Sequence, residues 1–442
     1  MSSTQVSAPE ARDGAAPASP SPAAASPRRY WVALMLIVAG ALTLRVVYVL
    51  ADRVGAPVQG DAVYYSLQAA ALADGRGFTC PLLGVPSVCP KKVPAADHPP
   101  MTALSLTPAE WLYASDRAKL LSTALYGTVG VLVIGLLGRR VAGDRAGLIA
   151  AGLAAVYPNL WINDGLMMSE TLAALSVALA LLFTYRIATR PSFANAVILG
   201  GVCGLMTLTR AELGLFIPIV ALPVVLLVRT TSLARRLAVA GVVAVSAVAL
   251  LATWVVPNMI RFEKPVYLST NDGVTIAGAN NPTVYSGPAL GLWTLAKYDT
   301  PKGDQSVVDS YLRHQGLSYA RHHLRRLPVV IAAREGLVWS VYRPSTSGHY
   351  NRGEGRELWA SWLGFGMYWA LVPLAIGGLL VLRRRHIMVW PLVAQFAMVT
   401  ITAAAFYGLI RFRIPAEVAL VVLAAAALDY LVGHRRVVGA AA

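Results

Sequence analysis

Long apolar segments separated by short polar connections run along most of the chain. Ten of them approach the length of about 20 apolar residues that a helix needs to cross a bilayer. These predicted spans cover residues 31–50, 118–138, 147–163, 167–185, 193–210, 212–229, 236–256, 359–382, 387–408 and 414–433. Two long stretches, residues 51–117 and 257–358, interrupt them. The pattern predicts an all-α integral membrane protein with about ten transmembrane helices and two long loops that contain short amphipathic helices.

Arginine is distributed unequally between the two sides of the predicted membrane. One side, which includes both chain ends, holds Arg28, Arg29, Arg139, Arg140, Arg145, Arg186, Arg190, Arg229, Arg235, Arg236, Arg383, Arg384, Arg385, Arg435 and Arg436. The short connections on the other side hold only Arg210, Arg411 and Arg413. Because cytoplasmic loops carry the excess of Lys and Arg, we expect a multi-pass plasma-membrane protein with cytoplasmic termini and both long loops outside.

The composition agrees with a membrane protein and excludes other classes. Of the 442 residues, 56% are hydrophobic and 14% are charged, whereas soluble domains carry about 25% charged residues. The net charge of +16 does not indicate nucleic-acid binding, because the basic residues form short clusters between apolar runs.

The chain divides by composition into four parts. Residues 1–27 are rich in Ala, Pro and Ser and predict a disordered cytoplasmic tail. Residues 28–256 form a predicted N-terminal transmembrane module, which includes the first long loop. Residues 257–358 form the second long loop, and residues 359–442 the C-terminal helices.

The three cysteines are Cys80, Cys89 and Cys203. Cys80 and Cys89 share the first long loop, and a disulfide between them is expected if that loop lies outside the cytoplasm; two free thiols are the alternative. Cys203 lies in an apolar run and is expected to be packed and inert.

The predicted topology gathers acids, aromatic residues, histidine and arginine near the outer ends of the spans. They are Asp61, Tyr64, Tyr65, Asp97, His98, Asn163, Asp164, Ser169, Glu170, Arg210, Glu212, Arg411 and Arg413. A carboxylate can take the proton of an attacking hydroxyl, and arginine can stabilise charge on a departing phosphate. The set indicates transfer of a group from a lipid-linked phosphate to a hydroxyl, at a face where nucleotide donors are absent.

Six motifs that follow one another along most of the chain resemble a known superfamily. They are GDAVYYSLQAAAL (60–72), HPPMTALSL (98–106), LLGRRVAGDRAGLIAAGLAAVYPNLWINDGLMMSETL (136–172), GGVCGLMTLTRAE (200–212), STNDGVTIAGANNP (269–282) and LIRFRIPAEVAL (409–420). The ordered set resembles the GT-C polyprenyl-phosphate-dependent glycosyltransferases. It is most similar to the branch with protein O-mannosyltransferases and bacterial aminoarabinose transferases (glycosyltransferase family 39).

The resemblance implies roles for individual residues. Asp61 matches the first-loop aspartate that acts as base or orients the acceptor, and Arg411 and Arg413 match a late basic pair. His98 stands where aminoarabinose transferases have a phosphate-contacting Lys, so a permanent charge is replaced by one that titrates near neutrality. Ala62 stands where many members have a second acid, which argues against a second carboxylate here and against a metal.

Plainer structural roles compete with catalysis in the first loop and at Glu170. Asp61 also fits the N-cap of a loop helix. Tyr64 and Tyr65 fit interfacial aromatic residues as well as substrate contacts, and Asp97 is a further candidate contact. Glu170 fits the acidic first turn of a helix as well as a substrate contact.

The basic candidates have structural alternatives too. Arg210 can form an ion pair with Glu212 instead of binding phosphate. Arg411 and Arg413 fit lipid-headgroup anchors, and they face one side only if the turn before Pro415 is extended. Arg45, near the outer end of the first span, fits either a side chain that reaches the interface or a part of the site.

The segment Tyr311–Ala333 interleaves basic and apolar residues and predicts an amphipathic helix on the outer membrane surface. It contains His314, His322 and His323, but no carboxylate or Cys stands beside them at the spacing of metal ligands. We expect no metal and no cofactor.

The sequence thus predicts a membrane glycosyltransferase. It would move a sugar, mannose or arabinose, from a polyprenyl-phosphate sugar to a hydroxyl acceptor at the outer face, with inversion. Asp61 is the expected base, and Arg411, Arg413, Arg210 and His98 are the expected phosphate ligands. The rival interpretation is a transporter or flippase of lipid-linked sugar, which should offer polar residues at the membrane midplane and an internal repeat. The acceptor, whether lipid, glycan or protein, stays open.

Overall fold

A computed structural model describes residues 27–81, 93–227 and 231–441. Across these ranges the regular elements are helices, as predicted. The long helices are α1 (Pro27–Tyr48), α4 (Asp116–Ala142), α7 (Glu170–Thr189), α10 (Leu233–Arg261), α15 (Leu358–Arg384) and α17 (Ile414–Ala441). The shorter bundle helices are α5 (Asp144–Val156), α6 (Pro158–Asp164), α8 (Phe193–Thr207), α9 (Leu222–Leu227) and α16 (Trp390–Ala405). The predicted tail, apart from Pro27, lies outside the described residues.

The ten predicted spans differ in how well they meet the requirements of a membrane helix. In the described ranges, six helices are long and apolar enough to cross a bilayer, or seven if the bent pair α5–α6 counts as one span. The remaining three predicted spans coincide with the shorter apolar segments Phe193–Thr207, Ala211–Leu227 and Trp390–Ala405. A membrane bundle is confirmed, whereas the count of ten is not.

Two predicted spans are broken, and proline accounts for both breaks. The segment 147–163 bends by 56° between α5 and α6, where Pro158 follows Tyr157 in an extended conformation. The segment 212–229 is divided into the 3-10 helix η2 (Ala211–Leu215), the π-helix η3 (Ile217–Ala221) and α9. Pro218 lies at the start of η3 and lacks the N–H that a continuous helix would use.

One large core holds the bundle together. It takes buried residues from α1, α4, α5, α7 and α8 of the N-terminal part and from α15, α16 and α17 of the C-terminal part. Helix α17 lies in its middle, with residues 412–427 buried. Small residues permit close approach: a Cβ on Gly378 of α15 would overlap the backbone of Leu423 in α17.

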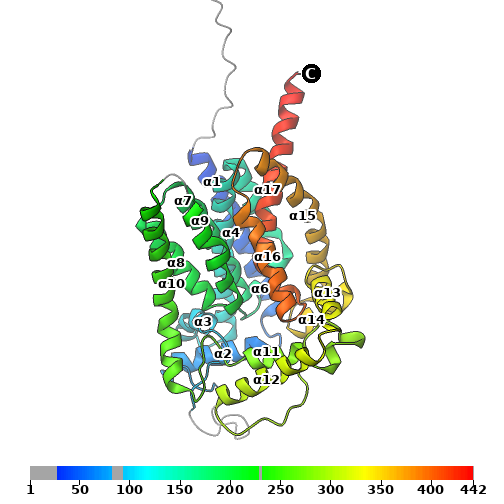
Figure 1. Cartoon of the computed structure of the whole chain (residues 1–442). Helices are drawn as coiled ribbons and strands as arrows, with labels where there is room; N and C mark the ends of the chain where they lie inside the picture. The colour runs from blue at the N-terminus through cyan, green and yellow to red at the C-terminus, as the bar shows by residue number, and fades with distance from the viewer. Residues whose placement is uncertain (1–26, 82–92, 228–230, 442) are drawn as a thin grey trace, which may run out of the picture.

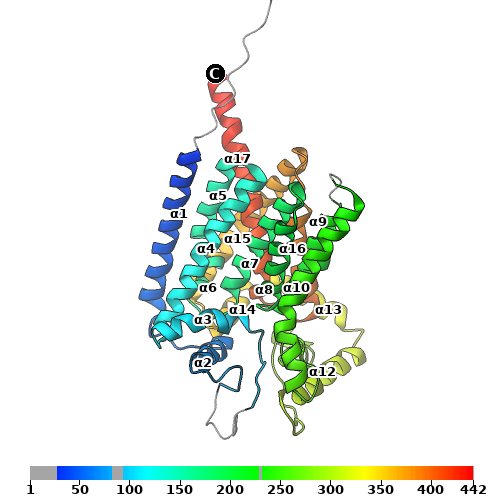
Figure 2. The ribbon, with the colours of Figure 1, turned by 90° about the vertical axis from the view of Figure 1, so that its left-hand side faces the viewer.

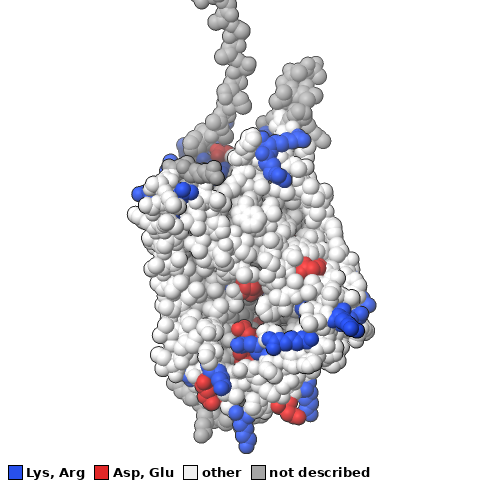
Figure 3. Space-filling model, viewed as in Figure 1, with Lys and Arg blue, Asp and Glu red and all other residues white. Residues whose placement is uncertain are grey.

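The start of α1 and the end of α17 lie at one end of the bundle, and the two long loops fold against the other (Figures 1 and 2). The first loop contains α2 (Asp61–Ala73) and α3 (Met101–Leu112). The second contains α11 (Asp272–Ala279), η4 (Pro282–Val284), η5 (Gly287–Ala289), α12 (Gln305–His322), α13 (Leu327–Val338) and α14 (Pro344–Gly353). Figure 3 shows mainly basic side chains at the end with the termini and both signs of charge at the opposite end.

The predicted amphipathic helix Tyr311–Ala333 is two helices rather than one. Helix α12 ends at His322, and α13 begins at Leu327 with Pro328 in its first turn. Proline favours a helix start at this position because the first turn needs no donor from its N–H.

Candidate active site at the loop end of the bundle

Asp61 is the first residue of α2 and does not cap that helix. Gly60 occupies the N-cap position with φ +60°, a conformation that glycine adopts readily. The N-cap interpretation of Asp61 is therefore wrong. Its carboxylate points to two basic side chains instead: Oδ2 lies 2.9 Å from Nη2 of Arg411, and Oδ1 lies 3.8 Å from Nε2 of His98.

Arg411 is the centre of the site. It lies on the 3-10 helix η6 (Ile410–Arg413), and its guanidinium uses each of its three nitrogens on a different carboxylate. Nη2 binds Asp61, Nε lies 2.7 Å from Oε1 of Glu170, and Nη1 lies 2.8 Å from Oε1 of Glu354. Three segments distant in sequence are thus fixed to one planar group.

Glu170 is fully buried at the start of α7 and holds three arginines. Besides Arg411, its Oε1 lies 3.0 Å from Nη1 of Arg210 and 3.5 Å from Nη2 of Arg356. Arg210 also pairs with Glu212 at 2.6 Å, so the predicted Arg210–Glu212 ion pair is present and coexists with a place in the site. These contacts compensate buried positive charge, which is costly without a partner.

Glu354 and Arg356 belong to the site but were missed in the sequence. They form an ion pair with each other, and Nε of Arg356 donates to Oδ1 of Asn163 at 3.0 Å. The available signal was RGEGRE, residues 352–357, a dense run of charge directly before the apolar helix α15. Charges beside a span that are retained there usually have a partner.

The ring of His98 packs against two aromatic rings that also contact each other. Its ring centroid lies 5.1 Å from that of Tyr64 and 5.0 Å from that of Tyr65. Tyr65 is buried, and the hydroxyl of Tyr64 is buried as well, so neither is an exposed interfacial residue. Asp97 accepts a hydrogen bond from Nε2 of Gln305 at 3.1 Å, which ties the first long loop to the second.

Asp61 and His98, which both lie in the first long loop, differ in their charge at neutral pH. Burial opposes ionisation of Asp61, but the charges of Arg411 and His98 outweigh it and lower the pKa of Asp61 to about 2. Burial lowers the pKa of His98, although the Asp61 and Asp97 carboxylates oppose this. Asp61 is therefore a carboxylate at neutral pH, and His98 tends to its neutral form.

Arg413 does not join this cluster, contrary to the sequence prediction. It is fully buried on the opposite side of η6, where Nε lies 2.5 Å from Oε1 of Glu417 and Nη1 donates to Ser340 and to the carbonyl of Val338. Its guanidinium lies 3.7 Å from the ring centroid of Tyr368. The helical turn sends the two arginines apart, so Arg413 is a structural residue.

Arg45 is also structural. Its Nε lies 2.6 Å from Oδ2 of Asp164, and its remaining donors reach the carbonyls of Ala41, Ala154 and Ala155. The pair is buried between α1, α5 and α6, so Arg45 neither reaches the interface nor enters the site.

Two cavities meet at Asp61 and Arg411. The first, which we call the helix cavity, has a volume of about 700 Å³. Its polar end includes His98, Arg210 and Arg411. Its apolar end lies between η2–η3 and α16 and is lined by Leu215, Pro218, Ile401, Thr402, Ala405 and Phe406. Figure 3 shows this face of the molecule hollowed, with acidic and basic side chains at the lower part of the hollow.

The second cavity, which we call the loop cavity, has a volume of about 460 Å³ and lies between Asp61 and the second long loop. The lining residues that it shares with the helix cavity are Asp61, Asn271, Thr275, Tyr407 and Arg411. Trp293 and Tyr350 add aromatic surface, and Glu354 adds a carboxylate. Asp61 is therefore reachable from both cavities.

Two further predictions concern metal and disulfide. Among the described residues, no three His, Cys, Asp or Glu side chains are grouped as metal ligands, and Glu170 is held by arginines. Cys203 is buried with a free thiol, and Cys80 is buried. Cys89 lies outside the described residues, so its pairing with Cys80 stays a prediction.

Residues 97–256 match the sequence model of the dolichyl-phosphate-mannose-protein mannosyltransferase family. No curated protein matches the chain. The family match covers His98, Glu170 and Arg210, but neither Asp61 nor Arg411. It agrees with the resemblance drawn from the sequence motifs.

Solved structures share the fold. The oligosaccharyltransferase of Archaeoglobus fulgidus, tethered to an acceptor peptide with the NVT sequon, aligns with a TM-score of 0.53 and 17% identity, over 92% of this chain and 50% of that chain. The same enzyme, AglB, with an inhibitory peptide and a dolichol-phosphate gives 0.53 and 17% over 94% and 52%. This chain thus spans about half the length of that enzyme.

ArnT of Cupriavidus metallidurans bound to undecaprenyl phosphate aligns with a TM-score of 0.41 and 18% identity, over 90% of this chain and 77% of that chain. The oligosaccharyltransferase alignments show that this chain shares the helical membrane fold of that enzyme.

Proposed function

We propose that the protein is a membrane glycosyltransferase that moves a sugar from a polyprenyl-phosphate sugar to a hydroxyl acceptor. The observation that carries this proposal is the helix cavity. One continuous space joins a polar end with Arg210, Arg411 and Asp61 to an apolar end between two bundle helices. A phosphate attached to a long hydrocarbon chain has the same division into a charged head and an apolar tail.

The opening of the cavity suits a substrate that arrives from the membrane. Ile401 of α16 lines the apolar end and is 47% exposed, so this end is open along the side of the bundle. The polyprenyl chain would lie there, which places the phosphate beside Arg210 and Arg411. Arginine matches phosphate because its donors form a fixed planar fork. His98 would add a hydrogen bond rather than a full charge.

The transfer needs one base and one leaving group. The acceptor oxygen forms a bond to the anomeric carbon while the bond from that carbon to the phosphate oxygen breaks. The electron pair stays on the phosphate, whose charge Arg411 and Arg210 stabilise. The acceptor proton passes to the Asp61 carboxylate. A single displacement of this kind inverts the anomeric configuration.

Arg411 connects donor binding with proton transfer, because it contacts both the expected phosphate position and Asp61. While it contacts Asp61, the carboxylate is a weak base with a pKa of about 2. When a donor phosphate shares the guanidinium, its hold on Asp61 weakens and the carboxylate becomes more basic. Donor binding would thus prepare the base, which limits proton transfer to the loaded site.

The loop end of the bundle would face the outside of the plasma membrane, with both termini in the cytoplasm. The supporting feature is the concentration of arginine at the end with the termini. Mannose is the first sugar to test, because the matched family is named for dolichyl-phosphate mannose; arabinose is the second. No nucleic acid takes part in this scheme.

The proposal is tested with purified protein in nanodiscs. Short-chain polyprenyl-phosphate mannose or arabinose, labelled in the sugar, is supplied with a cell-envelope extract as acceptor, and empty nanodiscs serve as control. We expect label to leave the lipid and appear on an acceptor with the inverted anomeric configuration. Movement of the labelled lipid between leaflets without any transfer would favour the flippase alternative and contradict the proposal.

A further inference from the structure

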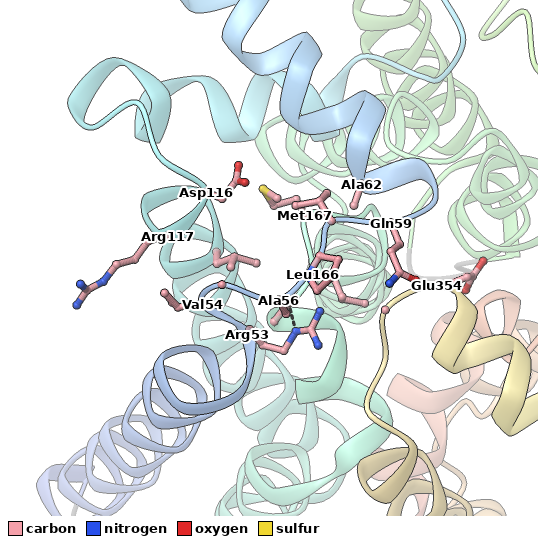
Figure 4. A pocket seen from close by; sticks show the side chains of 16 residues that line it. Arg53, Val54, Ala56, Gln59, Ala62, Asp116, Arg117, Leu166, Met167 and Glu354 are labelled. Carbon is pink, nitrogen blue, oxygen red and sulfur yellow. Dashed lines mark hydrogen bonds between the residues drawn. The ribbon is translucent and has the colours of Figure 1, made fainter.

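A third cavity lies on the other side of the α2 start from Asp61. We call it the Arg53 cavity; its volume is about 300 Å³, at the lower end of the size of ligand sites. Figure 4 shows Asp116 on one side, Glu354 on the opposite side, and Leu166 and Met167 between them. It lies apart from the helix cavity, with which it shares no lining residue.

Arg53 lines this cavity and provides a guanidinium donor to it. The residue is 7% exposed. Nε donates to the carbonyl of Gly165 at 3.1 Å, and Nη1 lies 2.7 Å from Oε1 of Glu357. Within the described ranges Nη2 has no hydrogen-bond partner, and it faces Gly355, whose φ is +88°. A guanidinium N–H that faces the cavity without a protein partner can donate to a ligand oxygen at this point.

The charges around the cavity are compensated. Arg53 is paired with Glu357, Asp116 lies 3.1 Å from Nζ of Lys119, and Glu354 is paired with Arg411. The exposed Arg117 and Gln59 complete the rim. The cavity therefore offers separate donors and acceptors around an apolar floor, without the excess of one charge that would select an ion. A neutral ring with several hydroxyl groups matches this arrangement, since each hydroxyl both donates and accepts.

The position of the cavity connects it with the reaction. Gly60 and Asp61 line the loop cavity, whereas Gln59 and Ala62 line the Arg53 cavity. Glu354 lines both. The start of α2 and Glu354 therefore border both cavities. Ala62, at the position where the resembling family often has an acid, contributes only a methyl group and leaves the space open.

We infer that the acceptor is a neutral glycan at least two sugar units long, whose terminal unit lies in the loop cavity at Asp61 and whose next unit lies in the Arg53 cavity. This inference rests on the proposed function and names its acceptor class. The aromatic side chains of the loop cavity suit the apolar face of the terminal ring, and the Arg53 cavity binds the adjoining ring through hydroxyl groups.

The test compares acceptors of different length with variants on α2. Ala62→Leu fills the Arg53 cavity, and Val63→Leu on the exposed neighbouring position is the matched control. With an array of neutral mono-, di- and trisaccharides, we expect wild type and Val63→Leu to bind some di- or trisaccharides more tightly than any monosaccharide. Ala62→Leu should lose this preference, with affinity for the longer glycan falling by about tenfold or more. Gln59→Ala, a rim change that leaves the fold intact, should weaken the same ligands.

The outcomes separate the two proposals. Release of free sugar from the lipid donor without acceptor reports the proposed function, whereas array binding reports the Arg53 cavity. Binding that is lost in Ala62→Leu supports the inference even if no transfer is detected. No binding by wild type, or equal loss with Val63→Leu, would overturn it.

Discussion

Nη2 of Arg411 lies 2.9 Å from the carboxylate of Asp61, while Nε of the same side chain lies 2.7 Å from the buried carboxylate of Glu170. The proposed phosphate ligand and the proposed base are therefore partners before any substrate arrives. Glu170 fixes the guanidinium from the side of the bundle, so that its remaining face is directed to Asp61 and the two cavities.

Arg411→Lys should impair transfer much more than folding. Lysine keeps a positive charge but lacks the planar fork that binds Asp61, Glu170 and Glu354 together. We expect kcat to fall by about 100-fold, the typical effect of removing one group that stabilises charge in the transition state. Single-turnover transfer with saturating donor measures this rate. Transfer by Arg411→Lys at the wild-type rate would contradict the prediction.

Arg413→Met should show the opposite pattern. The substitution leaves Glu417 buried without its cation, and removing one partner of a buried pair costs about 3–5 kcal/mol. The melting temperature in detergent should therefore fall, while the folded fraction keeps its affinity for the lipid donor. Adding Glu417→Gln should recover part of the stability. A normal melting temperature combined with lost donor affinity would contradict this prediction and would indicate that Arg413 binds the donor.

The pH dependence of activity should reflect the low pKa that Arg411 gives to Asp61. The pKa of Asp61 is about 2 in the folded protein and about 3.9 when unperturbed. Stabilisation by this depressed pKa is present above the unfolded value and is lost as pH falls through the folded value. An activity profile of the free enzyme should accordingly have no acidic limb from Asp61 between pH 5 and 8.

Arg411→Met should raise the pKa of Asp61, because burial then opposes ionisation of the carboxylate without the compensating guanidinium. The acidic decline of the activity profile should therefore move to higher pH. The residual kcat/KM of this variant should decline on acidification at a higher pH than in wild type. An unchanged profile would mean that Asp61 does not titrate in the reaction or that Arg411 does not control it.

Narrowing the helix cavity should weaken binding of the lipid chain of the donor rather than binding of its sugar. Ala405 lines the apolar end, and Ala405→Trp would occupy part of the space assigned to the polyprenyl chain. KM for a long-chain donor should rise by several-fold while that for a very short chain changes less. Leu237→Trp, on an exposed part of α10 that does not line this cavity, is the control.

Much of this account could be predicted from the sequence, because its signals are local. Apolar length predicted the bundle, and the exceptions to the arginine bias predicted Arg210 and Arg411. Glu354 could not be assigned in this way, because its contact with Arg411 joins two residues of different loops and depends on the whole fold. Arg413 was misassigned since a 3-10 turn, not an extended one, precedes α17. The break at Pro158 was a missed local signal.

In the proposed reaction, Asp61 takes the acceptor proton in a site where Arg411 holds the donor phosphate. This role of Asp61 is tested most directly by single-turnover transfer from preloaded donor in Asp61→Asn, with Asp74→Asn at the exposed end of the same helix as control. We predict that Asp61→Asn binds the lipid donor with an affinity close to that of wild type and transfers sugar at least about 100-fold more slowly, whereas Asp74→Asn behaves as wild type. Transfer by Asp61→Asn at the wild-type rate would contradict the account.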